Sequence, residues 1–382
     1  MQQDVRLPLE GLQHAVAIDV LLHGPLSRKQ LAARLGVSPG TLTRVAGPLL
    51  EAGLLVERAL VQRSSSGRPG IGRPEEPLDL ELGRDFYVGV KITENTLHCV
   101  VTTLRAQLVT EISRSLASLE PSAVADQITD VVGELSEEGR NIRALGVSLG
   151  GQVSRNSLVL EAPLLGWSDV DLGALLKDRM DLPVVVDNDV LSLVRAERWF
   201  GAAKDSDHFA LITIGAGIGY GLVAGSGILE GPDPGLSTIT HFPLGIGGGV
   251  CSQGHTGCAE SLLTTKALLS RARLALDENV THDELLALAD TNPAAASIVE
   301  TAAYGLGKLI ASVANLALPE KIILTGDGVD LALANREALD RGISDHRNRR
   351  ATPIDLEIQT VSFAEWARGA AATAIETFVV GR

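Results

Sequence analysis

The chain has 382 residues, of which 45% are hydrophobic, 21% charged and 3% aromatic, and it is long enough to bury at least two substantial cores. It contains no apolar run of the roughly 18 residues that a membrane-spanning helix needs, and its first residues lack the layout of a signal peptide. We therefore expect an ordered cytoplasmic protein without a membrane partner. Three cysteines cannot form a disulfide framework, which agrees with a reducing compartment.

The net charge of −14 is unevenly distributed along the chain. Residues 1–80 carry 9 Lys/Arg and 8 Asp/Glu, whereas the rest of the chain carries 24 and 39. Between residues 27 and 73, eight basic side chains stand against two acidic ones, which gives a local charge of +6. A basic segment on an acidic chain predicts a polyanionic partner for that end only.

The helical spacing of apolar residues near the N-terminus predicts three short helices, over residues 11–24, 26–36 and 37–53. Ser27 and Gln30 stand in the relation of a capping box at the start of the second helix. Ser38 is the expected N-cap of the third helix, followed by Pro39 at its first position. Pro48 predicts a kink in the third helix beyond this end.

Two helices joined by a tight Gly-Val-Ser turn are typical of a helix-turn-helix, whose second helix enters the major groove of DNA. We expect the start of the third helix to contact DNA through Ser38, Gly40, Thr41, Thr43 and Arg44. Residues 54–81 predict a two-stranded wing, in which Arg68 and Arg73 lie on a thin glycine-proline backbone that fits a minor groove. The alternative is a solvated three-helix bundle followed by a loose linker.

From residue 85 onward, predicted strands and helices succeed one another in two glycine-punctuated halves. The expected strands are 86–92, 97–104, 107–116 and 142–153, and the expected amphipathic helix is 121–138. Residues 182–201 predict a strand followed by a helix, so Asn188 and Asp189 lie at the carboxyl end of a strand, where open α/β sheets bind their ligands. A predicted hairpin over 209–229 and a helix-strand-turn over 305–328 complete a two-lobed α/β body with a cleft. The turn at 215–219 could present backbone amides to a phosphate.

From about Phe86 to the end, the chain resembles the ROK family of sugar kinases and sugar-responsive repressors. The matching stretches, in family order, are "APLLGWSDVDLGALLKDRMDLPVVVDNDV", "AERWFGAAK", "ITIGAGIGYGLV", "HFPLG" with "CSQGHTGCAE", and "IILTGDG". The resemblance implies an actin-like or hexokinase-like body, and the helix-turn-helix in front resembles the repressor branch. We therefore expect a winged helix-turn-helix domain over 1–80 and a two-lobed ligand-binding and dimerisation body over 81–382.

Both phosphate loops of the ROK kinases are altered in this chain. Where the family has Asp-x-Gly-Gly-Thr, the chain reads "GVKITENTL", with Lys91 in place of the aspartate and Glu94 close behind. The second loop, usually Gly-Thr-Gly, has Ala216 in place of the hydroxyl residue. Because phosphoryl transfer depends almost entirely on such positioning and charge, we expect no kinase activity and no bound nucleotide.

The resemblance assigns sugar contacts to Asn188, Asp189, His241 and Glu260. In the kinases, the residue that matches Asp189 is the catalytic base. Three other family positions appear as Leu164, Thr238 and Thr240, which replace an asparagine, a glutamate and a glycine. Losing the two polar contacts removes hydrogen bonds worth about 1 kcal/mol each. The alternative for Asp189 is a relic that is kept as a structural hydrogen-bond acceptor.

The ROK family also holds a structural zinc ion with one histidine and three cysteines. Here His241, Cys251 and Cys258 match three of these ligands, and Gln253 stands at the fourth position. An amide oxygen is a poor zinc ligand because it has neither the charge nor the softness of a thiolate. His255 or a water molecule could complete the set; the alternative is a metal-free turn with two buried cysteines.

Three hypotheses of function follow. The first is a transcriptional repressor, a homodimer or dimer of dimers, whose body senses a sugar or related small molecule and whose basic module binds a double-stranded DNA operator. The second is an active sugar kinase with an added DNA-binding domain. The third is a DNA-binding protein whose degenerate body is only a dimerisation scaffold. The departures at Lys91 and Ala216 favour the first over the second.

Overall fold

The computed structural model describes residues 11–58, 76–225, 227–231, 233 and 235–381. The reading module, a name used here for the N-terminal part up to Leu80, consists of α1 (Gly11–His23), α2 (Arg28–Arg34), α3 (Pro39–Glu51) and the antiparallel pair β1 (Leu55–Glu57) and β2 (Leu78–Leu80). The three predicted helices and the two strands of the wing are therefore present. The predicted wing tip, with Arg68 and Arg73, lies outside the described residues.

Side-chain caps define where α2 and α3 begin. Ser27 accepts a hydrogen bond from the Gln30 amide while the Gln30 side chain accepts one from the Ser27 amide, which completes the predicted capping box. Ser38 Oγ accepts from the Thr41 amide at 3.1 Å, with Pro39 in the first turn. Helix α3 continues through Pro48 to Glu51. The turn between α2 and α3 is closed by Gly36, whose φ of 65° is left-handed.

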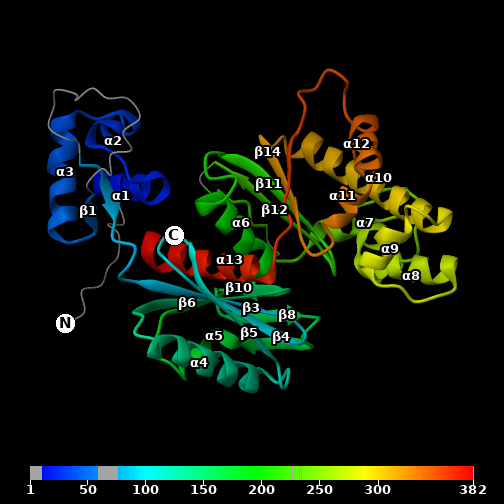
Figure 1. Cartoon of the computed structure of the whole chain (residues 1–382), viewed down its shortest axis with the longest axis horizontal. Coiled ribbons are helices and arrows are strands. Elements are labelled where there is room, and N and C mark those ends of the chain that lie inside the picture. The colour runs from blue at the N-terminus through cyan, green and yellow to red at the C-terminus, as the bar shows by residue number, and fades with distance from the viewer. Residues whose placement is uncertain (1–10, 59–75, 226, 232, 234, 382) are drawn as a thin grey trace.

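The body has two lobes, each built on a five-stranded sheet (Figure 1). The first lobe contains β3 (Phe86–Ile92), β4 (Thr96–Thr102), β5 (Leu108–Ser115), α4 (Pro121–Glu137), β6 (Ile142–Leu149), β7 (Gln152–Ser154), β8 (Leu158–Ala162), β9 (Trp167–Asp171), α5 (Leu172–Lys177), β10 (Val184–Asn188) and α6 (Asp189–Phe200). Its main sheet has the order β10-β6-β3-β4-β5, and β7-β8-β9 form a small separate sheet.

The second lobe contains β11 (His208–Ile214), β12 (Ile218–Ala224), β13 (Gly227–Ile228), the 3-10 turn η1 (Thr238–His241), α7 (Ala259–Leu263), α8 (Thr265–Leu276), α9 (His282–Leu288), α10 (Pro293–Leu316), β14 (Lys321–Thr325), α11 (Asp330–Ala334), α12 (Arg336–Asp345) and β15 (Asp355–Ile358). Its sheet has the order β13-β12-β11-β14-β15. The chain then returns to the first lobe through α13 (Phe363–Ile375) and the π-helical η2 (Glu376–Val380).

Residues 142–153 form two strands rather than the one predicted. Strand β6 ends at Leu149, and β7 begins at Gln152 in the other sheet. Gly150 and Gly151 lie between them, and a Cβ atom on Gly151 would lie only 2.2 Å from the Glu161 carbonyl oxygen. The glycines therefore let the chain leave one sheet and pass close against the next.

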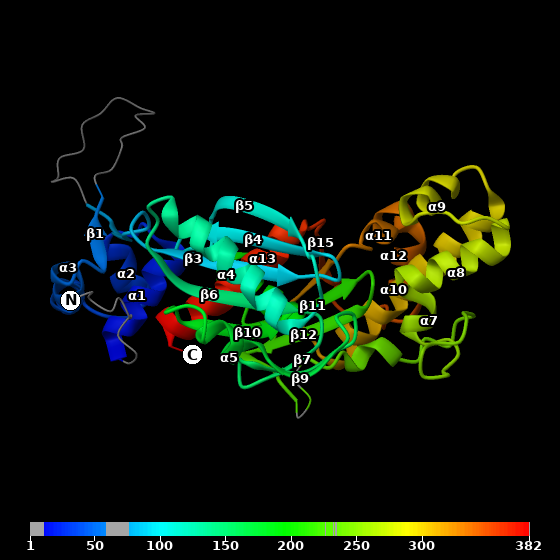
Figure 2. The same ribbon diagram turned by 90° about the horizontal axis from the view of Figure 1, so that it is seen from below.

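Helices cover both sheets in layers, and α13 lies between the lobes (Figures 1 and 2). Alternating residues of β3 and β6 face opposite sides of the sheet: Val88, Val90 and Val147 pack in one core with α4 and α5. On the other side, Gly89 and Gly146 face α13. A Cβ atom on either glycine would come within 1.9 Å of a carbonyl oxygen of α13, so the helix backbone rests directly on the strands.

No helix in the described part of the chain is long and apolar enough to cross a membrane.

We predict that Gly146→Ala lowers the free energy of unfolding by at least about 2 kcal/mol, because backbone atoms of α13 already occupy the place of the new methyl group. Gly133→Ala in the exposed part of α4 is the matched control, since nothing lies within 4 Å of its Cβ position and alanine is the better helix former by about 1 kcal/mol. Denaturant unfolding of both variants checks this. Equal stability of Gly146→Ala and the wild type would contradict the close approach.

Candidate functional site

A cleft of about 720 Å³ lies between the two lobes. Its lining comes from the ends of β3 and β10, the glycines after β6, the turn between β11 and β12, and the first turns of α13. The lining residues used below are Lys91, Leu164, Asn188, Asp189, Ala216, Asp327, Phe363 and Trp366. Two of the four predicted sugar contacts, Asn188 and Asp189, therefore face this cleft.

Lys91 forms an ion pair with Asp189 inside the cleft. The lysine and aspartate side chains are only 8% and 13% exposed, and the Lys91 ammonium also lies 5.4 Å from the ring centroid of Trp366. Strand register explains the encounter, because Lys91 pairs across the sheet with Ser148, which pairs with Asp187, two residues before Asp189. The Lys91 ammonium thus neutralises the Asp189 carboxylate inside the cleft.

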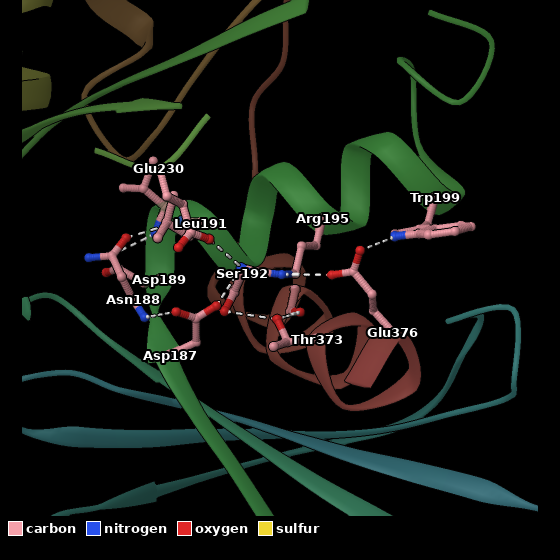
Figure 3. Close-up of polar contacts among 12 residues, drawn as sticks. Asp187, Asn188, Asp189, Leu191, Ser192, Arg195, Trp199, Glu230, Thr373 and Glu376 are labelled. Carbon is pink, nitrogen blue, oxygen red and sulfur yellow. Dashed lines mark hydrogen bonds and ion pairs between the residues drawn. The ribbon is translucent and has the colours of Figure 1, made fainter. Parts of the chain in front are cut away.

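The remaining polar atoms of Asn188 and Asp189 bond to the protein itself. Asn188 Oδ1 caps α6 by accepting from the Leu191 amide at 3.1 Å, and Nδ2 donates to the Gly151 carbonyl at 2.9 Å. Asp189 Oδ1 accepts from the Val190 amide at 2.8 Å. Figure 3 shows these side chains at the junction of β10 and α6. A ligand hydroxyl in the cleft would share these oxygens with their internal donors.

Amides of the glycine turn between β11 and β12 also bond to the protein itself. The Gly215 amide donates to the Gly217 carbonyl at 3.0 Å, and the Gly219 amide donates to Thr213 Oγ1 at 3.0 Å. The Asp327 carboxylate lies so close to Gly215 that a Cβ atom there would fall 1.7 Å from Asp327 Oδ1. A carboxylate beside the turn repels a phosphate, so the turn is a poor phosphate site.

His241 and Glu260, the other two predicted sugar contacts, are not among the residues that line the cleft. They flank the loop that contains Cys251, with His241 at the end of η1 and Glu260 in the first turn of α7, and His241 Nδ1 lies 3.3 Å from Glu260 Oε2. Glu260 also accepts hydrogen bonds from the amide and hydroxyl of Ser252 in this loop, at 3.3 and 3.0 Å. The carboxylate therefore bonds to the loop and to its other flank rather than facing the cleft.

The same loop brings four metal-ligating side chains together. One ligand atom each of His241, Cys251, His255 and Cys258 lies within 4.8 Å of all the others. The His255 amide donates to Cys251 Sγ at 3.2 Å. Gln253 is exposed, whereas both cysteines are buried. Two thiols and two imidazoles are the donor set of many tetrahedral zinc sites, so the residues fit that ion, with His255 as the fourth donor. The Cys99 thiol is separate from this cluster, and burial raises its pKa to about 12.

A buried ionic network lies behind the cleft (Figure 3). Arg195 of α6 pairs with Asp187, with Glu376 of η2 at 2.7 Å and with Glu230 at 3.3 Å. Trp199 Nε1 donates to Glu376 Oε1 at 2.9 Å. Burial raises the pKa of Asp187 to about 6, and the Arg195 guanidinium opposes that rise. The network connects the strand that bears Asn188 to the C-terminal segment of the chain.

The predicted DNA contacts are gathered at the start of α3. Ser38, Gly40, Thr43 and Arg44 are exposed. Thr41 is half-buried, and its hydroxyl lies 2.9 Å from Ser38 Oγ. Part of the basic charge of the module is neutralised internally. Arg28 pairs with Glu57, Arg34 with Asp19 and Arg58 with Asp79.

The sequence prediction did not identify Asp187, Arg195 or Glu376 as one group. Arg195 follows Asp187 by eight residues, about two turns along α6. The available signal in the sequence was an arginine in the helix that follows a predicted ligand-binding strand. Glu376 is distant in sequence and carries no local pattern. It joins the group only because α13 returns to the first lobe.

The ROK family model matches residues 87–376. Among characterised proteins, the xylose repressor of Bacillus subtilis is 23% identical over 311 residues, 80% of this chain and 79% of the repressor. A glucokinase of Halalkalibacterium halodurans is 29% identical over 290 residues, 70% of this chain and 87% of the enzyme. Repressors and kinases thus both resemble the chain.

Among solved structures, a ROK family transcriptional regulator described as a homologue of the Escherichia coli Mlc protein superimposes with a TM-score of 0.75 at 23% identity. The superposition covers 96% of both chains. A ROK family glucokinase from Streptomyces griseus superimposes on 76% of this chain with a TM-score of 0.65 at 22% identity. These likenesses confirm the predicted α/β fold class, with N-terminal helices in front of a two-lobed body of the kind that ROK kinases have.

We predict that Asp187→Asn changes how stability depends on pH. The folded-state pKa of Asp187, about 6, lies above the ordinary value of 3.8, so ionisation opposes folding. The wild type should lose stability relative to the variant as pH rises from about 4 to about 6, by up to ~3 kcal/mol, with no further change above pH 7. Urea unfolding at several pH values measures this difference. A difference that is independent of pH would contradict the raised pKa.

Proposed function

Because the chain belongs to the ROK family, we propose that it is a DNA-binding transcriptional regulator, a repressor whose body responds to a sugar or a related small molecule without transferring phosphate. The proposal is supported by the likeness to the xylose repressor over 80% of this chain and to a regulator structure along 96% of it. The glucokinase, by contrast, matches 70% of this chain. The regulator is a homodimer or a dimer of dimers in this proposal.

The observation that carries the proposal is the ion pair between Lys91 and Asp189. A catalytic base must hold a free carboxylate within reach of the substrate hydroxyl, and here Lys91 holds that carboxylate. Asp327 next to the Gly215 turn adds negative charge where a kinase stabilises phosphates. The cleft keeps a volume of about 720 Å³, which is ample for a sugar ligand.

DNA binding is proposed for the exposed start of α3. Ser38, Gly40 and Thr43 are small enough to let the helix approach base edges, and Arg44 is long enough to reach a base or a phosphate. Arg68 and Arg73 remain proposed minor-groove contacts of the wing. Together they give the acidic protein one basic surface for an operator.

A second candidate function is a DNA-binding protein with a ligand-independent body. The internal hydrogen bonds of Asn188 and Asp189 favour it, because both side chains already have partners. Thermal-shift measurements with neutral sugars and sugar phosphates separate the two candidates, since a ligand of the folded state raises the melting temperature. A coupled assay with ATP and hexoses tests the kinase alternative directly.

We also propose that His241, Cys251, His255 and Cys258 hold one structural zinc ion. The ion would cross-link the loop that contains Glu260 and would take no part in catalysis. His241 Nδ1 lies 3.6 Å from Cys251 Sγ and 3.3 Å from Glu260 Oε2, so the Glu260 carboxylate lies beside the proposed ion. His255 then takes the role that Gln253 cannot fill.

We predict that Arg44→Ala weakens operator binding by roughly tenfold or more, because an arginine that reads a guanine contributes about 1–3 kcal/mol of discrimination. Arg350→Ala, an exposed arginine of the second lobe, is the matched control. Operators selected from random DNA and gel-shift titrations at fixed salt concentration measure both affinities. An unchanged affinity for Arg44→Ala would remove this residue from the proposed interface.

For the metal, we predict roughly one zinc ion per chain in wild-type protein and in Cys99→Ser, and almost none in Cys258→Ser, which loses one of two thiolates. Elemental analysis of protein purified without chelators or metal-affinity resin measures the content. Metal-free wild-type protein would contradict the zinc site and would show that the two cysteines are only buried side chains of a turn.

A further inference from the structure

The reading module and the body share one apolar core. Val16, Val20 and Leu21 of α1 belong to the same buried cluster as Leu104, Trp199 and Val379 of the body, together with Tyr87, Ala106, Ile375 and Val380. Apolar burial holds two surfaces together but gives little preference for one angle between them. The orientation of the reading module on the body therefore needs directional contacts beside this shared core. The shared core and these contacts are together called the joint.

Arg105 supplies these contacts from the turn between β4 and β5. Its side chain is 14% exposed, and it donates from Nε to the Leu21 carbonyl at 2.9 Å and from Nη2 to the Val20 carbonyl at 2.7 Å. Both carbonyls belong to the last turn of α1. The Val20 carbonyl also accepts from the Gly24 amide at 2.9 Å, whereas the residue four positions after Leu21 is Pro25, which has no amide hydrogen. Arg105 thus supplies Leu21 with the donor that the chain cannot provide locally.

The same guanidinium also reaches the wing. Arg105 Nη2 lies 2.6 Å from Asp79 Oδ1 of β2, and Asp79 Oδ2 lies 3.3 Å from Arg58 Nε. Asp79 is buried at 5% exposure, so its charge depends on these partners. Gly24 leaves the space that the guanidinium fills, because a Cβ atom there would lie 2.5 Å from Nη2. One side chain of the body thereby joins the end of α1 to the wing strand.

We propose that Arg105 is the positioning residue that sets the angle of the reading module on the body, and so the spacing at which two copies of α3 meet DNA. The second part of the proposal rests on the proposed function. A planar guanidinium that serves two carbonyls and a carboxylate has little rotational freedom. Adding one base pair between half-sites moves one of them by about 3.4 Å and turns it by about 34°, so a loosened joint tolerates spacings that a fixed joint rejects.

The test uses three full-length variants. Arg105→Met keeps much of the side-chain volume and removes every donor. Gly24→Ala places a Cβ atom 2.5 Å from both Arg105 Nη2 and the Val20 carbonyl oxygen, so it disturbs the same contact from the opposite side. Arg114→Met is the matched control, because this arginine of the same lobe is 46% exposed and pairs with Glu134 at the surface. If Arg105→Met does not fold, Gly24→Ala carries the test.

The first measurement is amide hydrogen exchange in α1, which needs no DNA. Exchange should become about tenfold faster or more in Arg105→Met and Gly24→Ala, as expected when a local contact that limits opening is lost, and should stay unchanged in Arg114→Met. Wild-type exchange in both joint variants would overturn the proposal.

The second measurement compares selected operators whose half-sites are moved apart or together by one base pair. In Arg105→Met and Gly24→Ala, the preference for the original spacing should fall about fivefold or more. The affinity for a single half-site should be retained. General destabilisation of the protein would not produce this combination. Retained spacing preference would overturn the positioning role. If the wild type binds no DNA while exchange changes as expected, the proposed function fails and the assignment of the joint stands.

Discussion

The close approach of the α13 backbone to strands β3 and β6 is the constraint on which the arrangement of the molecule depends. Gly89 and Gly146 leave no side chain between helix and sheet, and Gly369 of α13 is correspondingly tight against α6, with a Cβ position 3.0 Å from Ser192. Interiors packed in this way do not deform gradually. The distance of helix α13 from the first sheet and from α6 is therefore fixed. The segments that contact its two ends are fixed relative to the first lobe in the same way.

Helix α13 connects the cleft between the lobes to the core that the body shares with the reading module. Phe363 and Trp366 at its start line the cleft, whereas Ile375, Val379 and Val380 at its end lie in the core shared with the reading module. Glu376 ties the same end to Arg195 and so to the strand that carries Asn188. A ligand that shifts the start of α13 acts on an element whose other end packs in the core that it shares with α1. The proposed sensing and reading functions thus have a common mechanical element.

Local signals in the sequence were sufficient for the N-terminal helices and for the strands of the main sheet of the first lobe, whereas the hexokinase-like body was implied by the resemblance to the ROK family. The capping residues Ser27, Gln30 and Ser38 determine helix ends through neighbours three residues away, and such short-range relations can be identified without a structure. The Lys91–Asp189 pair could not be, because it joins residues 98 positions apart and depends on strand register and on the side of the sheet that each residue faces. The sequence predicted Lys91 as an intruding cation and Asp189 as a sugar contact, with a structural relic as the alternative. That the two side chains neutralise each other could be seen only in the fold. His255 entered the metal cluster for a similar reason, since the turn after Cys251 determines which of several polar residues points inward.

The participation of residues near Val380 in the core of the reading module has an evolutionary consequence. A recombination that exchanged only residues 11–80 between two relatives would set new α1 side chains against an unmatched Val379 and Val380, and cores tolerate such mismatches poorly. The proposed DNA specificity would therefore not transfer with the N-terminal segment alone, since segments from opposite ends of the chain share one core. Divergence in the preferred operator should proceed instead by single substitutions on the exposed face of α3, where no core residue has to change in step.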